Sequence, residues 1–417
     1  IPKYRRARGF DSNNRHFAET ELKRLEEAGL IREDSGRYTQ FRHRWDAIRE
    51  VDPDNLIKLP NAGIVCLRLV ASEEKKDELC RVIDSSSSLN FLVDPLAFRV
   101  YPSCAFVYWV GSRIRSVFKE FDSVRERGYV TKNGLTSAHN WRFMRAAWEP
   151  RASNITSEHA HPREWNGPYC PISTDWVRVN KGGEFSPYSN ETLMLVNWKW
   201  DGQEVKSYKK SYVRNRRFYF RTGLTWQYLP YKRGAFSISQ RGAAFSGGGP
   251  MLYPPEEEVE AASAVLNSDA FIGCLHLLMP RGGVQTEQTL KYEQGLIESV
   301  PLPDFGKHSG RLVQLADRAA HANLFSANSN LRSNYFQLPA VLQADGETLS
   351  DRVDAWQASV ADQRETLIET QEEINEIAFD LYGLEPEDRV GLYMSLYGDD
   401  VALKYANGET EIRAFQG

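Results

Sequence analysis

The chain has 417 residues, of which 41% are hydrophobic and 26% charged, a composition typical of a globular protein with two or three domains. Its formal net charge is −4, and no window approaches the ~20 continuous apolar residues of a membrane-spanning helix, so we expect no membrane partner. The five cysteines are widely spaced without a C-x-x-C pair, which argues against a disulfide framework or a zinc knuckle. The N-terminal IPKYRRARGF lacks an apolar signal core, and we expect a cytoplasmic protein.

Residues 1–95 are interpreted as a mixed α/β N-terminal region. Apolar residues recur at helical spacing between Leu22 and Leu30, and a turn follows at Asp34–Gly36. This order would fit a winged-helix arrangement, although amphipathic helices followed by turns are common. Residues 62–71 (AGIVCLRLVA) are rich in β-branched side chains and predict a buried strand.

Two weak patterns could hold a metal ion. Asp54, Glu73 and Lys75 loosely match a nuclease pattern in which two carboxylates and a lysine hold Mg²⁺ and a water. His159 and His161 could both ligate a metal, but no carboxylate or cysteine lies nearby at ligand spacing. We favour solvated charges for the first pattern and a plain loop for the second, and we predict no metal site.

A predicted helix, SRIRSVFKEF at 112–121, precedes a polar turn, NGLTSAHNWRF at 133–143. In this turn Asn140 and Arg142 could contact a phosphate or a base. The loop would be held rigid by three aromatic residues, Trp141, Phe143 and Trp148. A capped turn without a binding role is the alternative interpretation.

The stretch Val196–Phe245 carries eleven Lys and Arg against two acids, a net charge of +9, and aromatic residues alternate with the cations. Phosphates are neutralised by Lys and Arg, base edges are recognised by Arg, Asn and Gln, and unstacked bases need aromatic faces. Double-stranded DNA is therefore the expected partner, and a β-rich core with a basic solvent face is the alternative. The candidate DNA-contacting residues, with Asn215, Gln227 and Gln240 as the expected partners of adenine, are Asn140, Arg142, Lys199, Lys206, Lys209, Lys210, Arg214, Asn215, Arg216, Arg217, Arg221, Trp226, Gln227, Tyr231, Lys232, Arg233, Gln240 and Arg241.

Beyond this stretch the chain becomes apolar and then acidic. Glu256–Glu258 suit the first turn of a helix, and Val259–Met279 reads as helical. Prolines make Leu296–Phe305 extended, and helical spacing resumes from Gly310. Residues 351–380 carry nine acids against two arginines, which predicts a packing or spacer helix. The same acidic helix could instead make this chain a protein-interaction subunit.

A series of short blocks resembles the C-terminal half of large bacterial adenine-specific DNA methyltransferases. These are the type IIG restriction-modification enzymes and the PglX-like BREX and DISARM phage-defence methylases. The blocks span about residues 95–390 and occur in the family's order: AFVYWVGSRIRSVFKEF, NGLTSAHNWRFMRAAWE, NKGGEFSPYSN, VNW, FYFRTGLTW, the turn at 245–250, AVLNSDAF, SVPLPDF and EINEIAFDLYGL. The resemblance implies a target recognition domain with a helical tail. It would present one adenine to a catalytic domain in the same polypeptide or a separate subunit, with other defence proteins as further partners.

Three departures limit what can be carried over. The family's catalytic Asn-Pro-Pro-Tyr/Phe is absent from this sequence, so no catalytic residue is assigned. Residues 245–249 (FSGGG) match the family's S-adenosylmethionine loop as a string, but they lie where the family has its recognition-domain turn. We therefore predict a structural turn, with S-adenosylmethionine bound by the parent enzyme outside this chain; a permuted methylase is the alternative. The family's Thr-Gly-Asp-Asn corresponds here to 136–140 (TSAHN), and the change of Asp to His puts that loop's role in doubt.

The sequence thus predicts an α+β protein in three parts. Residues 1–95 form the mixed N-terminal region, 96–305 form a β-rich target recognition domain, and 306–417 form a helical spacer or tail. A protein-interaction subunit of a defence complex and a magnesium-dependent nuclease remain the alternative functions.

Overall fold

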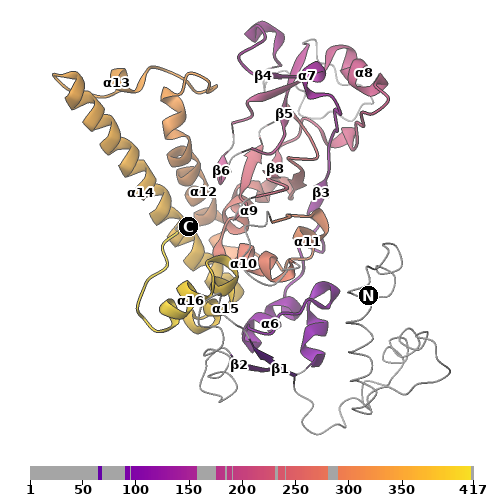
Figure 1. Cartoon of the computed structure of the whole chain (residues 1–417), viewed down its shortest axis with the longest axis vertical. Helices are drawn as coiled ribbons and strands as arrows, with labels where there is room; N and C mark the ends of the chain where they lie inside the picture. The colour runs from indigo at the N-terminus through magenta and orange to yellow at the C-terminus, as the bar shows by residue number, and fades with distance from the viewer. Residues whose placement is uncertain are drawn as a thin grey trace, which may run out of the picture. The chain divides into compact units, whose positions relative to one another are not determined.

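A computed structural model describes residues 64–67, 90–93, 95–156, 175–183, 186–189, 191–230, 233–239, 241–279 and 290–414 (Figure 1). The predicted winged-helix segment, the predicted nuclease residues Asp54, Glu73 and Lys75, and His159 with His161 lie outside these residues. The described residues mix helices with three sheets, which confirms the α+β class. All of them belong to one compact unit, Ile64–Gly417, and the boundaries at 95 and 305 stay predictions.

The strand predicted at 62–71 forms as β1 (Ile64–Leu67), which pairs with β2 (Asn90–Val93) in an antiparallel ladder. The strands that follow, β3 to β11, form two larger sheets. A four-stranded sheet has the order β10-β5-β7-β4, and a five-stranded sheet has the order β3-β11-β8-β9-β6. Their strands are β3 (Val130–Lys132), β4 (Met144–Ala146), β5 (Trp176–Asn180), β6 (Tyr188–Ser189), β7 (Met194–Asn197), β8 (Gly223–Trp226), β9 (Phe236–Ser239), β10 (Ala243–Phe245) and β11 (Met251–Tyr253). Strands of the two sheets therefore alternate along the chain.

The helices follow the expected apolar spacing in most places. The predicted helix at 112–121 is α6 (Ser112–Glu120), and Val259–Met279 divides into α9 (Val259–Leu266) and α10 (Asp269–Leu278). The prediction for Leu296–Phe305 was partly wrong, because residues 296–298 belong to α11 (Gln294–Glu298); the prolines that exclude a helix come only at Pro301 and Pro303. The remaining helices are α7 (Asn140–Phe143), α8 (Lys199–Ser207), α12 (Ser309–Leu324), α13 (Ala340–Gln343), α14 (Leu349–Tyr382), α15 (Pro386–Leu396) and α16 (Asp399–Ala406).

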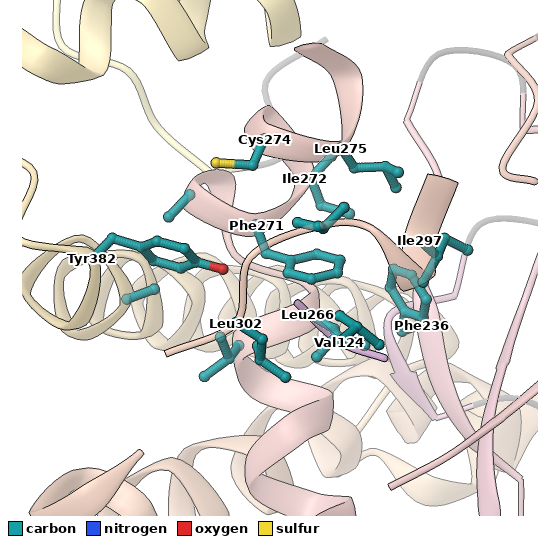
Figure 2. Packing of buried hydrophobic residues seen from close by; sticks show 14 of the residues in the cluster. Val124, Phe236, Leu266, Phe271, Ile272, Cys274, Leu275, Ile297, Leu302 and Tyr382 are labelled. Carbon is teal, nitrogen blue, oxygen red and sulfur yellow. The ribbon is translucent and has the colours of Figure 1, made fainter. Parts of the chain in front are cut away.

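The larger hydrophobic core surrounds α9 and α10, in which every residue except Glu260 is buried, and Figure 2 shows Phe271 among its core neighbours. Phe236 of β9 and Tyr382 of α14 reach this core from distant parts of the sequence. The turn between the two helices is held by polar groups: Asn267 binds both backbone groups of Phe236, and Ser268 caps α10 by accepting from Phe271. Two of the sequence blocks that resemble the methyltransferases, AVLNSDAF and EINEIAFDLYGL, therefore contribute residues to this core.

The acidic helix α14 lies against α12, and Figure 1 shows the two side by side. Its carboxylates form ion pairs with neighbouring segments. Glu373 pairs with Arg311 of α12 at 2.7 Å, and Glu376 pairs with Arg389 of α15 at 2.6 Å. These two ion pairs join α14 to α12 and α15.

No single helix in the described ranges combines the length and apolarity needed to cross a membrane. The bent pair Glu256–Leu266 and Asp269–Leu278, with 78° between its parts, meets those criteria only when the two are taken together.

Candidate nucleic-acid interface

A second, smaller core supports the surface made by α7, α8 and the connection 208–222. Trp198, Tyr219 and Phe245 are fully buried in it, and their rings contact one another, with centroids 5.7 Å apart for Trp198–Tyr219 and 4.7 Å for Tyr219–Phe245. α7 and α8 are neighbours, because Arg142 of α7 donates to Glu204 of α8 at 2.9 Å. These three aromatic residues of the basic stretch therefore belong to the core and not to the surface.

The helix α8 was not predicted, and its first turn is irregular. Trp200, Asp201 and Gly202 have φ values of 49°, 60° and 70°, so three successive residues are left-handed. This conformation costs roughly 1–2 kcal/mol for each residue with a side chain. Gly202 donates its N–H to the carbonyl of Trp198 at 2.9 Å, and this bond closes the turn.

The two acids of the basic stretch are neutralised locally. Asp201 pairs with Lys206 at 2.7 Å and also with Arg216, while Glu204 pairs with Arg142 at 2.8 Å. Six other cations of the stretch have no carboxylate partner in the described part of the chain, and all six are exposed: Lys199, Lys209, Lys210, Arg214, Arg217 and Arg221. Carboxylates of the described residues therefore do not cancel the charge of these six cations.

The connection 208–222 is anchored to the polar turn at 133–140, although some 80 residues separate them. Thr136 and Tyr212 exchange both backbone hydrogen bonds, at 2.8 and 2.9 Å. Asn215, itself left-handed with φ 52°, donates its side-chain amide to the carbonyl of Asn133 at 2.8 Å. The structure thus brings together the two segments in which DNA-contacting residues were predicted.

Asn140 lies at the start of α7 and joins this turn to the end of β5. Its Oδ1 accepts from Ser137 Oγ at 2.6 Å and from Lys181 Nζ at 2.8 Å. Burial lowers the pKa of the Lys181 ammonium below its ordinary value, because the charged form loses part of its hydration. Lys181 is a cation of this surface that the sequence analysis missed, since it lies outside the basic stretch.

Two predicted contact residues, the buried Trp226 and the half-buried Arg233, bind other parts of the protein, and we correct the prediction for both. Trp226 is 2% exposed, and its indole N–H donates to the carbonyl of Tyr292 at 2.9 Å, so its ring cannot stack on a base. Arg233 forms an ion pair with Asp269, whose side chain is 2% exposed, and donates to the carbonyl of Asn267 at 2.6 Å. Both residues stabilise the larger core.

The structure also bears on five further predicted contact residues, two of which it describes. Gln227 holds the backbone, since it donates to Gly183 O at 3.3 Å and accepts from Ala235 N at 3.3 Å. Arg241 is half-buried. The remaining predicted residues, Tyr231, Lys232 and Gln240, lie outside the described residues.

Two of the three aromatic residues predicted to hold the polar turn were assigned incorrectly. Phe143 is buried as expected, but Trp141 is 90% exposed and Trp148 is 54% exposed, so neither tryptophan holds the loop rigid. Trp200 and Tyr212 are also exposed, at 74% and 55%. Sequence reasoning counted these last two among the interleaved aromatics but could not separate them from buried neighbours such as Trp198.

The glycine-rich turn after β10 is filled by the chain's own backbone. A Cβ atom at Gly248 would lie 2.7 Å from Lys181 O, and one at Gly249 would lie 2.5 Å from Gly182 N. On the other side, Gly134 approaches the carbonyl of Phe245 so closely that a Cβ atom would lie 1.9 Å away. These close backbone approaches explain why glycine occupies positions 134, 248 and 249. Among the residues that the structure describes, no cluster of His, Cys, Asp or Glu could hold a metal ion.

Comparison with known proteins gives one informative relative. No protein-family model matches the chain. Over 363 residues, 82% of its length, the chain is 25% identical to the adenine-specific methyltransferase PglX of Lacticaseibacillus casei (strain Zhang). The chain is thus related to an adenine-specific methyltransferase, as the resemblance implied, and it spans 28% of that relative's length.

A solved structure, the type IIL restriction-modification enzyme MmeI in complex with DNA, is similar over 56% of this chain and 31% of the MmeI chain. The sequence identity is 14% and the TM-score is 0.30, values too low to define a shared fold.

Proposed function

We propose that this chain is the DNA-recognition part of an adenine-specific DNA methyltransferase of a restriction-modification or phage-defence system. The molecule that it binds is double-stranded DNA. S-adenosylmethionine and the catalytic groups belong to the parent enzyme outside these residues, since the family's Asn-Pro-Pro-Tyr/Phe is absent here.

The observation that supports this role is the group of six exposed cations without carboxylate partners between Lys199 and Arg221. Proteins release counterions from DNA when Lys and Arg neutralise phosphates, so each such contact adds about 0.9 to the salt dependence of binding. If all six cations contact phosphates, the slope of log K against log salt would be roughly −5. The relationship to PglX supports the same role but spans only part of that protein.

Phosphate contacts set the position of a protein on DNA, while base contacts give sequence specificity. Asn140 and Asn215 are exposed and each has part of its amide engaged by the protein, which fixes the orientation of the side chain. A positioned amide can form the paired hydrogen bonds that recognise adenine in the major groove. We therefore assign base reading to Asn215, which engages the described residues through one amide N–H, whereas the Oδ1 of Asn140 already accepts two hydrogen bonds. Phosphate binding is assigned to the surrounding cations.

The test is binding of the chain to random duplex DNA of about 30 base pairs across a salt series, with S-adenosylmethionine binding followed by calorimetry. A steep salt slope without a cofactor signal is expected. A cofactor signal would place chemistry in this chain, and absence of DNA binding at low salt would overturn the proposal.

Arg216 and Arg217 form a matched pair for this test. Arg217 is exposed and has no described carboxylate partner, so Arg217→Ala is expected to flatten the slope by ~1. Arg216 pairs with Asp201, so Arg216→Ala is expected to change the slope less. Equal slopes for the wild type and Arg217→Ala would remove Arg217 from the phosphate contacts.

A protein-interaction role has separate support in the helical region. Four leucines between α12 and the start of α14 are exposed: Leu331, Leu338, Leu342 and Leu349. Clusters of exposed apolar side chains are common at protein interfaces. Partner capture that persists after neutralisation of Lys209, Lys210 and Arg217, in a chain that binds no DNA at low salt, would favour this function.

A further inference from the structure

Trp200 combines an exposed aromatic side chain with a strained backbone conformation. Its side chain is 74% exposed, so its ring gains little from burial. Its backbone is left-handed with φ 49°, a conformation unfavourable for a side chain of this size. Packing of the Trp200 ring therefore does not offset the conformational cost of its left-handed backbone. Backbone strain of this kind often accompanies binding sites.

The surrounding structure holds the turn in place. Trp198 is buried two residues earlier, and its ring lies 3.2 Å from the position that a Cβ atom at Gly202 would take. Asp201 is fixed by ion pairs with Lys206 and Arg216. Lys199 donates its backbone N–H to the side chain of Asn197 at 3.1 Å. Trp200 is thus the exposed member of a turn whose other residues are anchored.

The charge around Trp200 indicates which ligand its ring would meet. Lys199 Nζ lies 4.9 Å from the centroid of the Trp200 ring and has no carboxylate partner in the described ranges. The same combination recurs nearby, where Arg214 lies 5.4 Å from the ring of the exposed Tyr212. An aromatic plane beside an uncancelled cation suits a nucleotide, because the cation can bind the phosphate while the ring stacks on the base.

We propose that Trp200 is a stacking residue, and that its ring packs on the exposed face of a DNA nucleobase while Lys199 neutralises an adjacent phosphate. The inference rests on the proposed DNA-recognition function and adds a contact that the basic residues alone do not provide. The base face could come from an unpaired nucleotide or from a base step opened by the ring.

The test compares a paired duplex of about 30 base pairs with the same duplex carrying one unpaired thymidine. Trp200→Ala is expected to weaken binding to the bulged duplex on the order of 5- to 150-fold, the range for loss of one aromatic–base stack. The salt slope should not change, since tryptophan carries no charge. Trp200→Phe should retain most of the affinity, and Trp148→Ala is the control because Trp148 is an exposed tryptophan beside the acid Glu149.

The two duplexes also distinguish whether the stacked base comes from an unpaired nucleotide or from a base step opened by the ring. Loss confined to the bulged duplex indicates an unpaired nucleotide, and equal loss on both duplexes indicates an opened base step. Wild-type affinity for both duplexes in Trp200→Ala would overturn the stacking role while leaving the DNA-recognition function intact. Failure of the wild-type chain to bind any DNA at low salt would overturn both. Thermal unfolding of each variant checks that the fold is retained, as expected for a side chain that is 74% exposed.

Discussion

Around α14, arginine side chains lie against carboxylates: Arg311 and Arg389 each bind a glutamate of this helix with two hydrogen bonds between 2.6 and 2.9 Å. Between Lys199 and Arg221, six exposed cations have no such partner in the described residues. The two regions use the same residue types for different purposes. Paired arginines hold helices together, whereas unpaired cations leave a positive surface free for an external anion. This difference can be tested by removing charge from each region in turn.

The largest effect is expected from Arg233→Ala. This change leaves the buried Asp269 carboxylate without its arginine, and removal of one partner of a buried ion pair costs about 3–5 kcal/mol of stability. Urea unfolding measures the loss, and the exposed Arg217→Ala should stay within about 0.5 kcal/mol of the wild type. A stable Arg233→Ala variant with a flattened salt slope of DNA binding would instead show that Arg233 contacts DNA phosphates.

A combined change of Lys209, Lys210 and Arg214 to Gln should reduce the salt slope of DNA binding by roughly 3, because three phosphate contacts are lost. The control changes Arg311, Arg318 and Arg413 to Gln, which removes the same charge from residues paired with carboxylates of α14. Equal slopes for the two triple variants would show that only net charge matters and would end the distinction between the regions.

Glu298 provides a pH test of a paired acid. Burial alone would raise its pKa, but hydrogen bonds from Thr131 and Arg125 outweigh burial and hold the pKa below its ordinary value. A carboxyl group with a lowered folded-state pKa stabilises the protein above its unfolded pKa, about 4.3 for Glu, and the stabilisation is lost as the pH falls through the folded value. Glu298→Gln should therefore cost below about 1 kcal/mol at neutral pH, because the Arg125 side chain is largely exposed and solvent screens the pair.

The cost of Glu298→Gln should shrink in acid, where the wild-type carboxyl is protonated as well. Urea unfolding of both proteins at neutral pH and below pH ~4 measures this difference. A cost that does not depend on pH would mean that the ionised carboxylate does not stabilise the fold.

The smallest effect is expected from Glu204→Gln, which converts a paired cation into an unpaired one. The Arg142–Glu204 pair is largely exposed, so its loss should cost below about 1 kcal/mol. DNA affinity should rise modestly, because Arg142 is released and a negative charge is removed. Isothermal titration at low salt measures this change, and weaker binding would show that Glu204 positions Arg142 for contact.

Sequence periodicity predicted much of the helical region, since α6, α12 and α14 have regular apolar spacing. It missed α8, because a left-handed turn at its start interrupts any helical pattern. Proline spacing also misled the analysis at α11, whose five residues end before Pro301.

The position of the basic surface could be predicted from sequence, but the role of its individual residues could not. Arg233 and Arg217 look alike in a charge count, and only the fold brings Asp269, 36 residues later, against Arg233. In the same way, Trp141 and Phe143 are two residues apart on one turn of helix, yet the first is 90% exposed and the second is buried. Burial of one residue in a short irregular segment depends on tertiary contacts that local spacing does not encode.

The alternation of strands between the two larger sheets has a consequence for how this protein folds. Within the described part between Val130 and Tyr253, the chain passes from one sheet to the other six times. Most strands that pair within one sheet are separated in sequence by strands of the other, so the pairing in both sheets depends on contacts between distant residues. Such topologies fold slowly, on the order of milliseconds to seconds. Transplanting the basic surface to another protein would therefore require moving both sheets together.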